Sequence, residues 1–179
     1  NGGALPSSAG CSGNCPAGTG ANDPINLRAQ IKVPTNAQSM SYKFRFFSSE
    51  YWTYSCTTFN DFYLALLTST AVGIPADKNI SFDAAGNPVS VNNGFFEVCQ
   101  PKGCYTCPSG LAGLAGTGMQ VANTGGATNW LTTTAPVVGG ETITMEFMVF
   151  DVSDNILDTN VLLDAFQFSV TPSGVGTTD

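Results

Sequence analysis

Three aspartates, Asp151, Asp154 and Asp158, fall within eight positions of a chain that otherwise carries few charges. Carboxylates this close repel one another unless protons, cations or hydrogen-bond donors lie between them. The sequence contains no histidine, and it has six lysines and arginines in total to act as partners. Calcium binds six to eight oxygens from carboxylates, amides, carbonyls and water, and Asn155 and Asn160 add two amides to this stretch. We therefore predict a structural calcium site here. The alternative is that these aspartates cap turns by accepting backbone N–H bonds.

A second set of candidate residues lies between two strand-like segments, where Glu50, Tyr51, Trp52 and Tyr54 are followed by Asp61. Flat aromatic faces beside polar groups are suited to stacking against sugar rings. Tyr51, Trp52 and Tyr54 are therefore candidate ligand-binding residues, and the alternative is that they pack against the rim of the fold. Glu50 and Asp61 would complete the calcium sphere if their loop meets the aspartate loop at one end of the molecule.

The absence of histidine excludes Ser–His–Asp and Cys–His catalysis. A glycosidase with two carboxylates needs no histidine, and Glu50 with Asp61 or Asp151 could supply such a pair. No spacing singles out this pair, so we predict that the protein is not an enzyme. A carboxylate-pair hydrolase remains a third alternative.

An even number of cysteines indicates an oxidising compartment. The six residues are Cys11, Cys15, Cys56, Cys99, Cys104 and Cys107. The C-x4-C-x2-C spacing of the last three also occurs in ferredoxins, but that pattern needs a fourth cysteine downstream. Zinc is disfavoured because the chain lacks histidine and a second CxxC. We predict disulfides, with Cys11 and Cys15 as the local pair, whereas the remaining four cysteines allow three connectivities that the sequence leaves open.

Composition limits the class of protein further. The 179 residues suit one domain, and 6 basic against 13 acidic residues give a net charge of −7. Such a chain repels phosphate backbones and anionic membranes, and no apolar run is long enough to span a bilayer. We therefore predict neither nucleic-acid binding nor direct membrane insertion. Charged residues make up 11% of the chain, which favours an all-β extracellular protein over a helical cytosolic one.

Alternation of apolar and polar residues, the pattern of half-buried strands, recurs along much of the chain. It is clearest at residues 25–33, 40–46 and 143–149, whereas residues 62–67 and 161–168 are more continuously apolar and are predicted to be covered on both faces. Shorter strands are predicted at residues 79–82, 89–91, 95–98 and 129–133, and one helical turn near 111–115. These elements predict an all-β fold: a two-sheet antiparallel sandwich, jelly-roll-like and stapled by disulfides.

The predicted domain spans residues 25–170. Residues 1–24 are rich in glycine, serine, alanine and proline and are predicted to form an irregular lead-in with a local cystine. Residues 171–179 have the same character and are predicted to be a linker. The stretch 99–126 has no strand pattern and is predicted to be a cysteine-rich insert held by disulfides.

An ordered series of motifs runs through residues 22–170. It includes FSSEY at 47–51, FNDF at 59–62, GNPVSVNN at 86–93, GATNWL at 126–131, PVVGGET at 136–142 and DVSDNILDTNVLLDAFQF at 151–168. This series resembles the choice-of-anchor L family of secreted bacterial proteins, particularly its cysteine-bearing, myxobacterial-type forms. The resemblance implies an exported β-rich domain attached to the cell surface by one of several C-terminal anchors, with no established reaction or ligand. The family's acidic motif is often D-x-G-D-x-x-x-D-S; Ser153 and Thr159 replace its glycine and serine here, and the three aspartates match.

We predict a non-enzymatic extracellular or cell-surface module for adhesion or surface recognition, with a surface or matrix glycan or protein as its partner. Calcium would order the loops that carry the aromatic residues. The alternative is a structural subunit of an extracellular filament or matrix, whose partners are copies of itself joined at a free sheet edge. The predicted location is outside the cell. There the protein is either anchored through a segment that these residues do not include or released into the medium.

Overall fold

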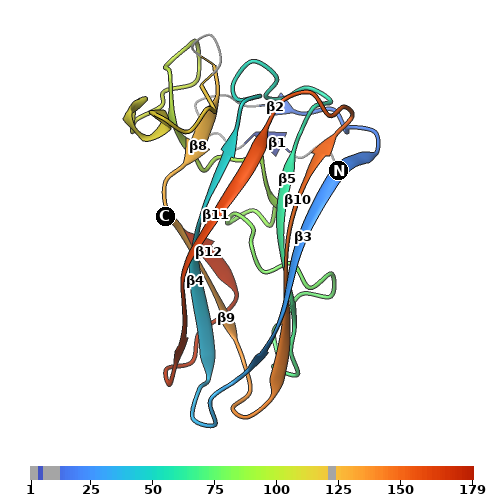
Figure 1. Ribbon diagram of the computed structural model, residues 1–179, viewed down its shortest axis with the longest axis vertical. Helices are drawn as coiled ribbons and strands as arrows, with labels where there is room; N and C mark the ends of the chain where they lie inside the picture. Colours follow the sequence, from blue (N-terminus) through green and yellow to red (C-terminus); the bar gives the residue numbers. More distant parts are fainter. Residues whose placement is uncertain (1–3, 6–12, 121–123) are drawn as a thin grey trace.

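The computed structural model describes residues 4–5, 13–120 and 124–179. Two β-sheets face each other as the layers of a sandwich (Figure 1), and every pairing between the described strands is antiparallel. This confirms the predicted all-β, two-sheet antiparallel sandwich. The jelly-roll connectivity stays a prediction.

The smaller sheet has four strands, in the order β3 (Ala21–Lys32), β10 (Thr142–Val152), β5 (Phe62–Thr68) and β6 (Val89–Ser90). The larger sheet runs from β12 (Gly176–Thr178) through β9 (Leu131–Pro136), β4 (Ser39–Ser48) and β8 (Gly126–Thr128) to β7 (Phe96–Cys99), and β11 (Thr159–Ser169) pairs with β4. A separate pair joins β1 (Ala4–Leu5) to β2 (Gly13–Asn14).

The predicted helical turn is the short 3₁₀ helix η2 (Ala112–Leu114). No helical segment within the described residues has both the length and the hydropathy that a membrane crossing requires.

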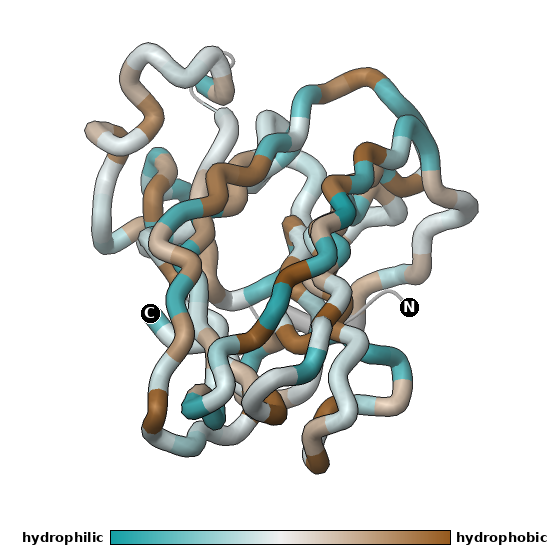
Figure 2. Tube along the Cα trace, turned by 60° about the horizontal axis from the view of Figure 1, so that its bottom comes forward, coloured by the Kyte–Doolittle hydropathy of each residue, from teal (hydrophilic) through white to brown (hydrophobic). Residues whose placement is uncertain are grey.

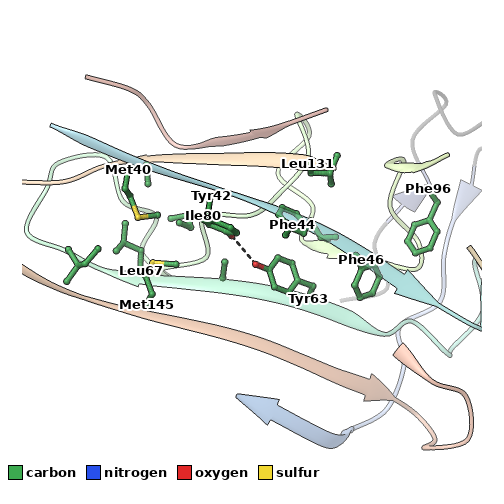
Figure 3. Packing of buried hydrophobic residues seen from close by; sticks show 14 of the residues in the cluster. Met40, Tyr42, Phe44, Phe46, Tyr63, Leu67, Ile80, Phe96, Leu131 and Met145 are labelled. Carbon is green, nitrogen blue, oxygen red and sulfur yellow. Dashed lines mark hydrogen bonds between the residues drawn. The ribbon is translucent and has the colours of Figure 1, made fainter. Parts of the chain in front are cut away.

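Apolar and polar residues alternate along the strands (Figure 2), so each strand turns one row of side chains into the sandwich. The inward row of β4 meets inward residues of β5 and β10 (Figure 3). From these three strands the figure labels Met40, Tyr42, Phe44, Phe46, Tyr63, Leu67 and Met145. All seven side chains are buried. Burying one large apolar side chain stabilises a fold by roughly 1.5–3 kcal/mol, so this layer is the main source of stability.

A chain of hydroxyl groups crosses the core. Tyr63 donates a hydrogen bond to Tyr42 at 3.1 Å, and the Tyr42 and Ser81 hydroxyls are 2.6 Å apart. Ser81 contacts Thr133 at 2.9 Å, and Thr133 contacts Thr177 at 2.8 Å. Burial raises the pKa of Tyr42 to about 12. Because each buried hydroxyl has a partner, polar atoms can occupy the centre without a large desolvation penalty.

The two continuously apolar segments were predicted to be covered on both faces, and the structure contradicts this. Along β5, buried and partly exposed residues alternate. On β11, Leu162 is 47% exposed and Phe166 is 37% exposed. The physical reason is that the sandwich has two layers, so each sheet has one outer face. Residues 79–82 also differ from the prediction, since they form isolated bridges rather than a strand.

Both boundaries of the predicted domain differ in the structure. β3 begins at Ala21, four residues before the predicted start. β12 adds residues of the predicted linker to the larger sheet by pairing with β9. Threonines supply the contacts of β12, including the buried Thr177 hydroxyl, so no apolar alternation marked this strand in the sequence.

The fold is stapled by disulfides as predicted, but the predicted pairing was wrong. Cys15 bonds to Cys56, across 41 residues, and Cys99 bonds to Cys107. Cys15 is therefore not the partner of Cys11, which lies outside the described residues, and Cys56 is not joined to the later cysteines. Cys104 is disulfide-bonded as well. Hydrogen bonds hold residues 18–20 of the lead-in close to the loop that carries Cys56. The Thr19 amide donates to Ser153 Oγ, and Ser153 Oγ donates to the Thr58 carbonyl.

Candidate functional site

The loop between β4 and β5 meets the loop between β10 and β11 at one end of the sandwich, the upper end in Figure 1. The Ser49 amide donates to the Asp158 carbonyl at 3.0 Å. Asp61, just before β5, accepts hydrogen bonds from the Val152 amide at 3.1 Å and the Thr159 hydroxyl at 2.5 Å. Glu50 and Asp61 therefore lie against the loop that carries the three predicted calcium ligands.

Two carboxylates at this junction are almost fully buried. Glu50 is 2% exposed and Asp61 is 0% exposed. Within the described residues, Glu50 Oε2 and Asp154 Oδ1 are buried atoms without a hydrogen-bond partner. A buried, unpaired carboxylate oxygen is costly, so both atoms are candidates for contact with a bound cation.

The carboxyl groups shift one another's titration. Burial, followed by the charges of Asp61, Asp154 and Asp151, raises the pKa of Glu50 to about 8. Burial, followed by Asp61 and other nearby aspartates, raises the pKa of Asp151 to about 6. Burial also raises the pKa of Asp61, although hydrogen bonds from Thr159 and Val152 oppose the shift. Such a cluster cannot be fully ionised at neutral pH without positive charge.

The cluster is not a finished metal centre. In the described parts of the chain, no three Asp, Glu, His or Cys side chains converge closely enough to hold a metal ion. Glu50, Asp61, Asp151 and Asp154 nevertheless act on one another electrostatically. Asp158 takes a different position, because its side chain is exposed and its backbone carbonyl is bound by Ser49. Calcium binding stays a prediction.

The three aromatic candidates have different surroundings. Tyr51 is 2% exposed and its ring stacks on Phe96, with centroids 4.3 Å apart. Its ring lies over Gly126, where a Cβ atom would come within 2.5 Å of the ring. Trp52 is half-buried, donates from Nε1 to the Gln100 carbonyl at 2.8 Å, and has the Lys102 ammonium 3.8 Å from its ring centroid. Tyr51 thus packs into the fold, and Tyr54, 38% exposed, is the most open of the three.

A cleft that the sequence did not indicate lies on the outer face of the smaller sheet and has a volume of about 510 Å³. Phe62, Leu64 and Leu66 of β5 and Phe150 of β10 form its apolar floor. The rings of Phe62 and Phe150 stack with centroids 5.6 Å apart and planes at 14°. The cleft therefore contains a pair of stacked aromatic rings, which we call the aromatic platform.

Amide side chains border this cleft and are held in place. Asn60 Oδ1 accepts from the Asn92 amide at 2.9 Å, and Asn92 Oδ1 accepts from the Cys56 amide at 2.6 Å. Asn87 donates from Nδ2 to Asp83 Oδ2 at 3.0 Å. Two features of the sequence together could have indicated the cleft. The outward residues of β5 are uncharged, and the NPVSVNN stretch is rich in asparagine. Strand alternation alone could not show that these distant segments meet.

The family model of the choice-of-anchor L domain matches residues 29–169. The matched range covers β4, both meeting loops and all five predicted metal ligands. Neither a curated protein nor a solved structure shows significant similarity to the chain.

Proposed function

We propose that this chain, which belongs to the choice-of-anchor L family of surface-associated extracellular modules, is a non-enzymatic adhesion domain that recognises a glycan. The disulfides fit a location outside the cell. The observation that carries the proposal is the cleft on the outer face of the smaller sheet, with its stacked Phe62–Phe150 floor and amide rim. Sugar rings bind to flat aromatic surfaces, and amides exchange hydrogen bonds with hydroxyls.

The cleft replaces the aromatic loop as the proposed recognition site. Tyr51 is buried and Trp52 is covered by Lys102, so this loop offers little flat surface. The cleft instead combines a large apolar floor with a few ordered polar groups, which is the usual make-up of a ligand site.

A non-enzymatic role agrees with the family, which is not a family of enzymes, and with the burial of the carboxylate pair. Glu50 and Asp61 are 2% and 0% exposed. A polysaccharide could not reach both groups without opening of the loops that cover them.

Binding to a glycan array tests this proposal. The intact protein is expected to bind a limited set of neutral glycans, and Phe150→Ala is expected to weaken that binding at least tenfold because half of the aromatic platform is lost. The matched control is Val72→Ala, at a position that is 95% exposed and does not line the cleft. Circular dichroism confirms that both variants are folded. A parent that binds no glycan, or a folded Phe150→Ala variant that binds as the parent does, contradicts the proposal.

We also propose that calcium stabilises this module at the junction of the two loops. The support is the pair of buried, unpartnered oxygens, Glu50 Oε2 and Asp154 Oδ1, beside Asp61 and Asp151. Calcium takes oxygen ligands with flexible geometry, so small side-chain rotations can close these carboxylates around it. The ion would neutralise the cluster and join β4, β5 and β10 at the end where their loops meet.

Thermal unfolding with calcium and with EDTA tests the cation site. Calcium is expected to raise the melting temperature of the parent by several degrees through binding to the folded state alone. Asp154→Asn is expected to abolish this response. Asp164→Asn, an exposed position on β11, is expected to keep it. An equal response in the parent and in Asp154→Asn, or no response in the parent, contradicts the assignment.

A further inference from the structure

One side of the sandwich is open, between the outer strands of the two sheets. β3 borders it from the smaller sheet and β11 from the larger sheet. Two adjoining grooves, of about 180 and 280 Å³, run along this side. The larger part of their lining is apolar and comes from Ile25 and Leu27 of β3, Phe147 and Val149 of β10, and Val161 and Leu163 of β11.

The apolar side chains of β3 at this opening are uncovered. Ile25 is paired with Val149 and Leu27 with Phe147, so they belong to the row that faces the sandwich. They are nevertheless 73% and 57% exposed. Inward positions of a sandwich are normally buried, so among the described residues no element covers the core here.

The two bordering strands differ in how their edges are protected. β11 is interrupted by a bulge between Asp164 and Gln167, a device that blunts an edge. β3 keeps an unbroken register with β10 from Lys32 to Ile25. No described strand pairs with its outer edge, and its inward residues from 25 to 31 carry no charge. β3 has an irregularity at Asp23 and Pro24, and from Ile25 to Lys32 it is a regular edge that can accept another strand.

The two ends of β3 carry opposite charge. Asp23, Asp151 and Asp158 lie beside Ile25 at the start of the strand. Lys32 stands at its end, and its ammonium is bound by the neutral Gly140 carbonyl.

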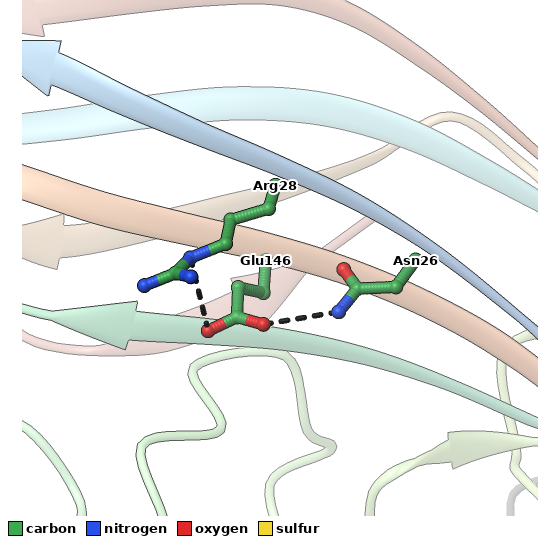
Figure 4. A network of polar contacts seen from close by, with 3 residues as sticks. All are labelled: Asn26, Arg28 and Glu146. Atoms are coloured by element: carbon green, nitrogen blue, oxygen red, sulfur yellow. Dashed lines mark hydrogen bonds and ion pairs between the residues drawn. The ribbon is translucent and has the colours of Figure 1, made fainter.

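In the middle of β3 the charge is already neutralised. Glu146 of β10 lies 3.8 Å from Arg28 and accepts a hydrogen bond from Asn26 at 3.0 Å (Figure 4). The remaining charges of the strand thus form an acidic start and a basic end, which are complementary in an antiparallel pair.

We propose that the outer edge of β3 pairs antiparallel with β3 of a second copy of this chain. A two-fold axis near Leu27 would join the two four-stranded sheets into one continuous sheet. The Ile25 and Leu27 side chains of each copy would then cover those of the other, and the acidic start of each strand would lie beside Lys32 of its partner. The interface is self-complementary, as two-fold symmetry requires. Ile25 and Leu27 do not line the cleft, and only the acidic end of the interface adjoins the cation site, through Asp151. The pairing therefore goes beyond the proposed recognition function.

Sedimentation velocity and light scattering over a range of protein concentrations test the pairing. The parent is expected to change from monomer to dimer as concentration rises. Leu27→Lys is expected to weaken dimerisation at least tenfold, because an inward charge on a strand edge opposes pairing. Val72→Lys adds the same charge at a position that is 95% exposed and away from β3, and it is expected to dimerise as the parent does. If Leu27→Lys does not fold, Ile25→Lys, at a 73% exposed position, takes its place.

Hydrogen exchange identifies the surface that pairs. Amides of β3 are expected to exchange more slowly in the dimer than in the monomer, while those of β11 change little. A protein that stays monomeric at all concentrations overturns the proposal. So does a dimer that leaves the β3 amides unprotected, or a folded Leu27→Lys variant that dimerises as strongly as the parent.

Discussion

At the scale of single residues, Glu50 carries the most unusual chemistry in the molecule. Its side chain is 2% exposed and its Oε2 atom has no described partner. In the sequence it is one glutamate beside an aromatic loop, and nothing marks it as buried. The sequence could predict that Glu50 and Asp61 meet the aspartate loop, because loops at one end of a sandwich cluster. It could not predict the burial, which depends on how those loops pack.

Glu50 should make the stability of the protein fall as pH rises in the absence of a cation. The unfolded chain ionises this group near its ordinary pKa of 4.5, whereas burial and neighbouring aspartates raise the folded pKa to about 8. Between these values the folded state binds more protons, so each pH unit lowers the free energy of unfolding by about 1.4 kcal/mol at most. The contribution is fully present below pH 4.5 and is lost as pH rises through 8.

Urea unfolding of the parent and of Glu50→Gln in EDTA, at pH 5 and at pH 8, measures this effect. Glutamine stays neutral, so the variant is expected to lose less stability over this range than the parent. Glu97→Gln, a partly exposed glutamate on β7, serves as the control and should follow the parent. The same pH dependence in the parent and in Glu50→Gln would show that Glu50 is not protonated in the fold.

At the scale of elements, the sequence predicts best where one strand has a single buried row. β4 and β10 show this alternation and were predicted nearly to their ends. β12 was missed because threonine hydroxyls, not apolar side chains, attach it to β9. β5 was predicted correctly as a strand, but its outer apolar row was predicted to be buried. In the structure this row forms the floor of the cleft. Alternation therefore predicts strands, whereas it does not predict what covers each face.

The two described disulfides should contribute unequally, because they close loops of different length. Cys15–Cys56 spans 41 residues and Cys99–Cys107 spans 8. In the chain-entropy model these loops correspond to about 4 and about 2.5 kcal/mol of stability. Guanidinium unfolding of Cys15→Ser/Cys56→Ser and of Cys99→Ser/Cys107→Ser is expected to show the larger loss for the first pair. Equal losses, or a larger loss for the second pair, would mean that packing at these sites outweighs loop closure.

At the scale of the whole molecule, the cysteine-rich insert is part of the sandwich rather than a separate unit. Cys99 and Cys107 belong to the same buried cluster as Phe44 and Met145. Tyr51 stacks on Phe96 at the start of β7, and Trp52 is bonded to Gln100. Because the insert contributes these residues to the main core, we expect one cooperative unfolding transition.

The two tryptophans allow this cooperativity to be measured. Trp130, 41% exposed, stands beside β9, whereas Trp52 contacts the insert. In Trp130→Phe, fluorescence reports from Trp52 alone, and its transition in guanidinium is expected to coincide with the loss of β-structure followed by circular dichroism. In the matched variant Trp52→Phe, fluorescence reports from Trp130, and its midpoint should likewise coincide with the circular-dichroism midpoint of that variant. A Trp52 transition at a lower denaturant concentration than the circular-dichroism transition would contradict this prediction. The insert and aromatic loop would then open separately from the sandwich, and the loop junction would not share the stability of the core.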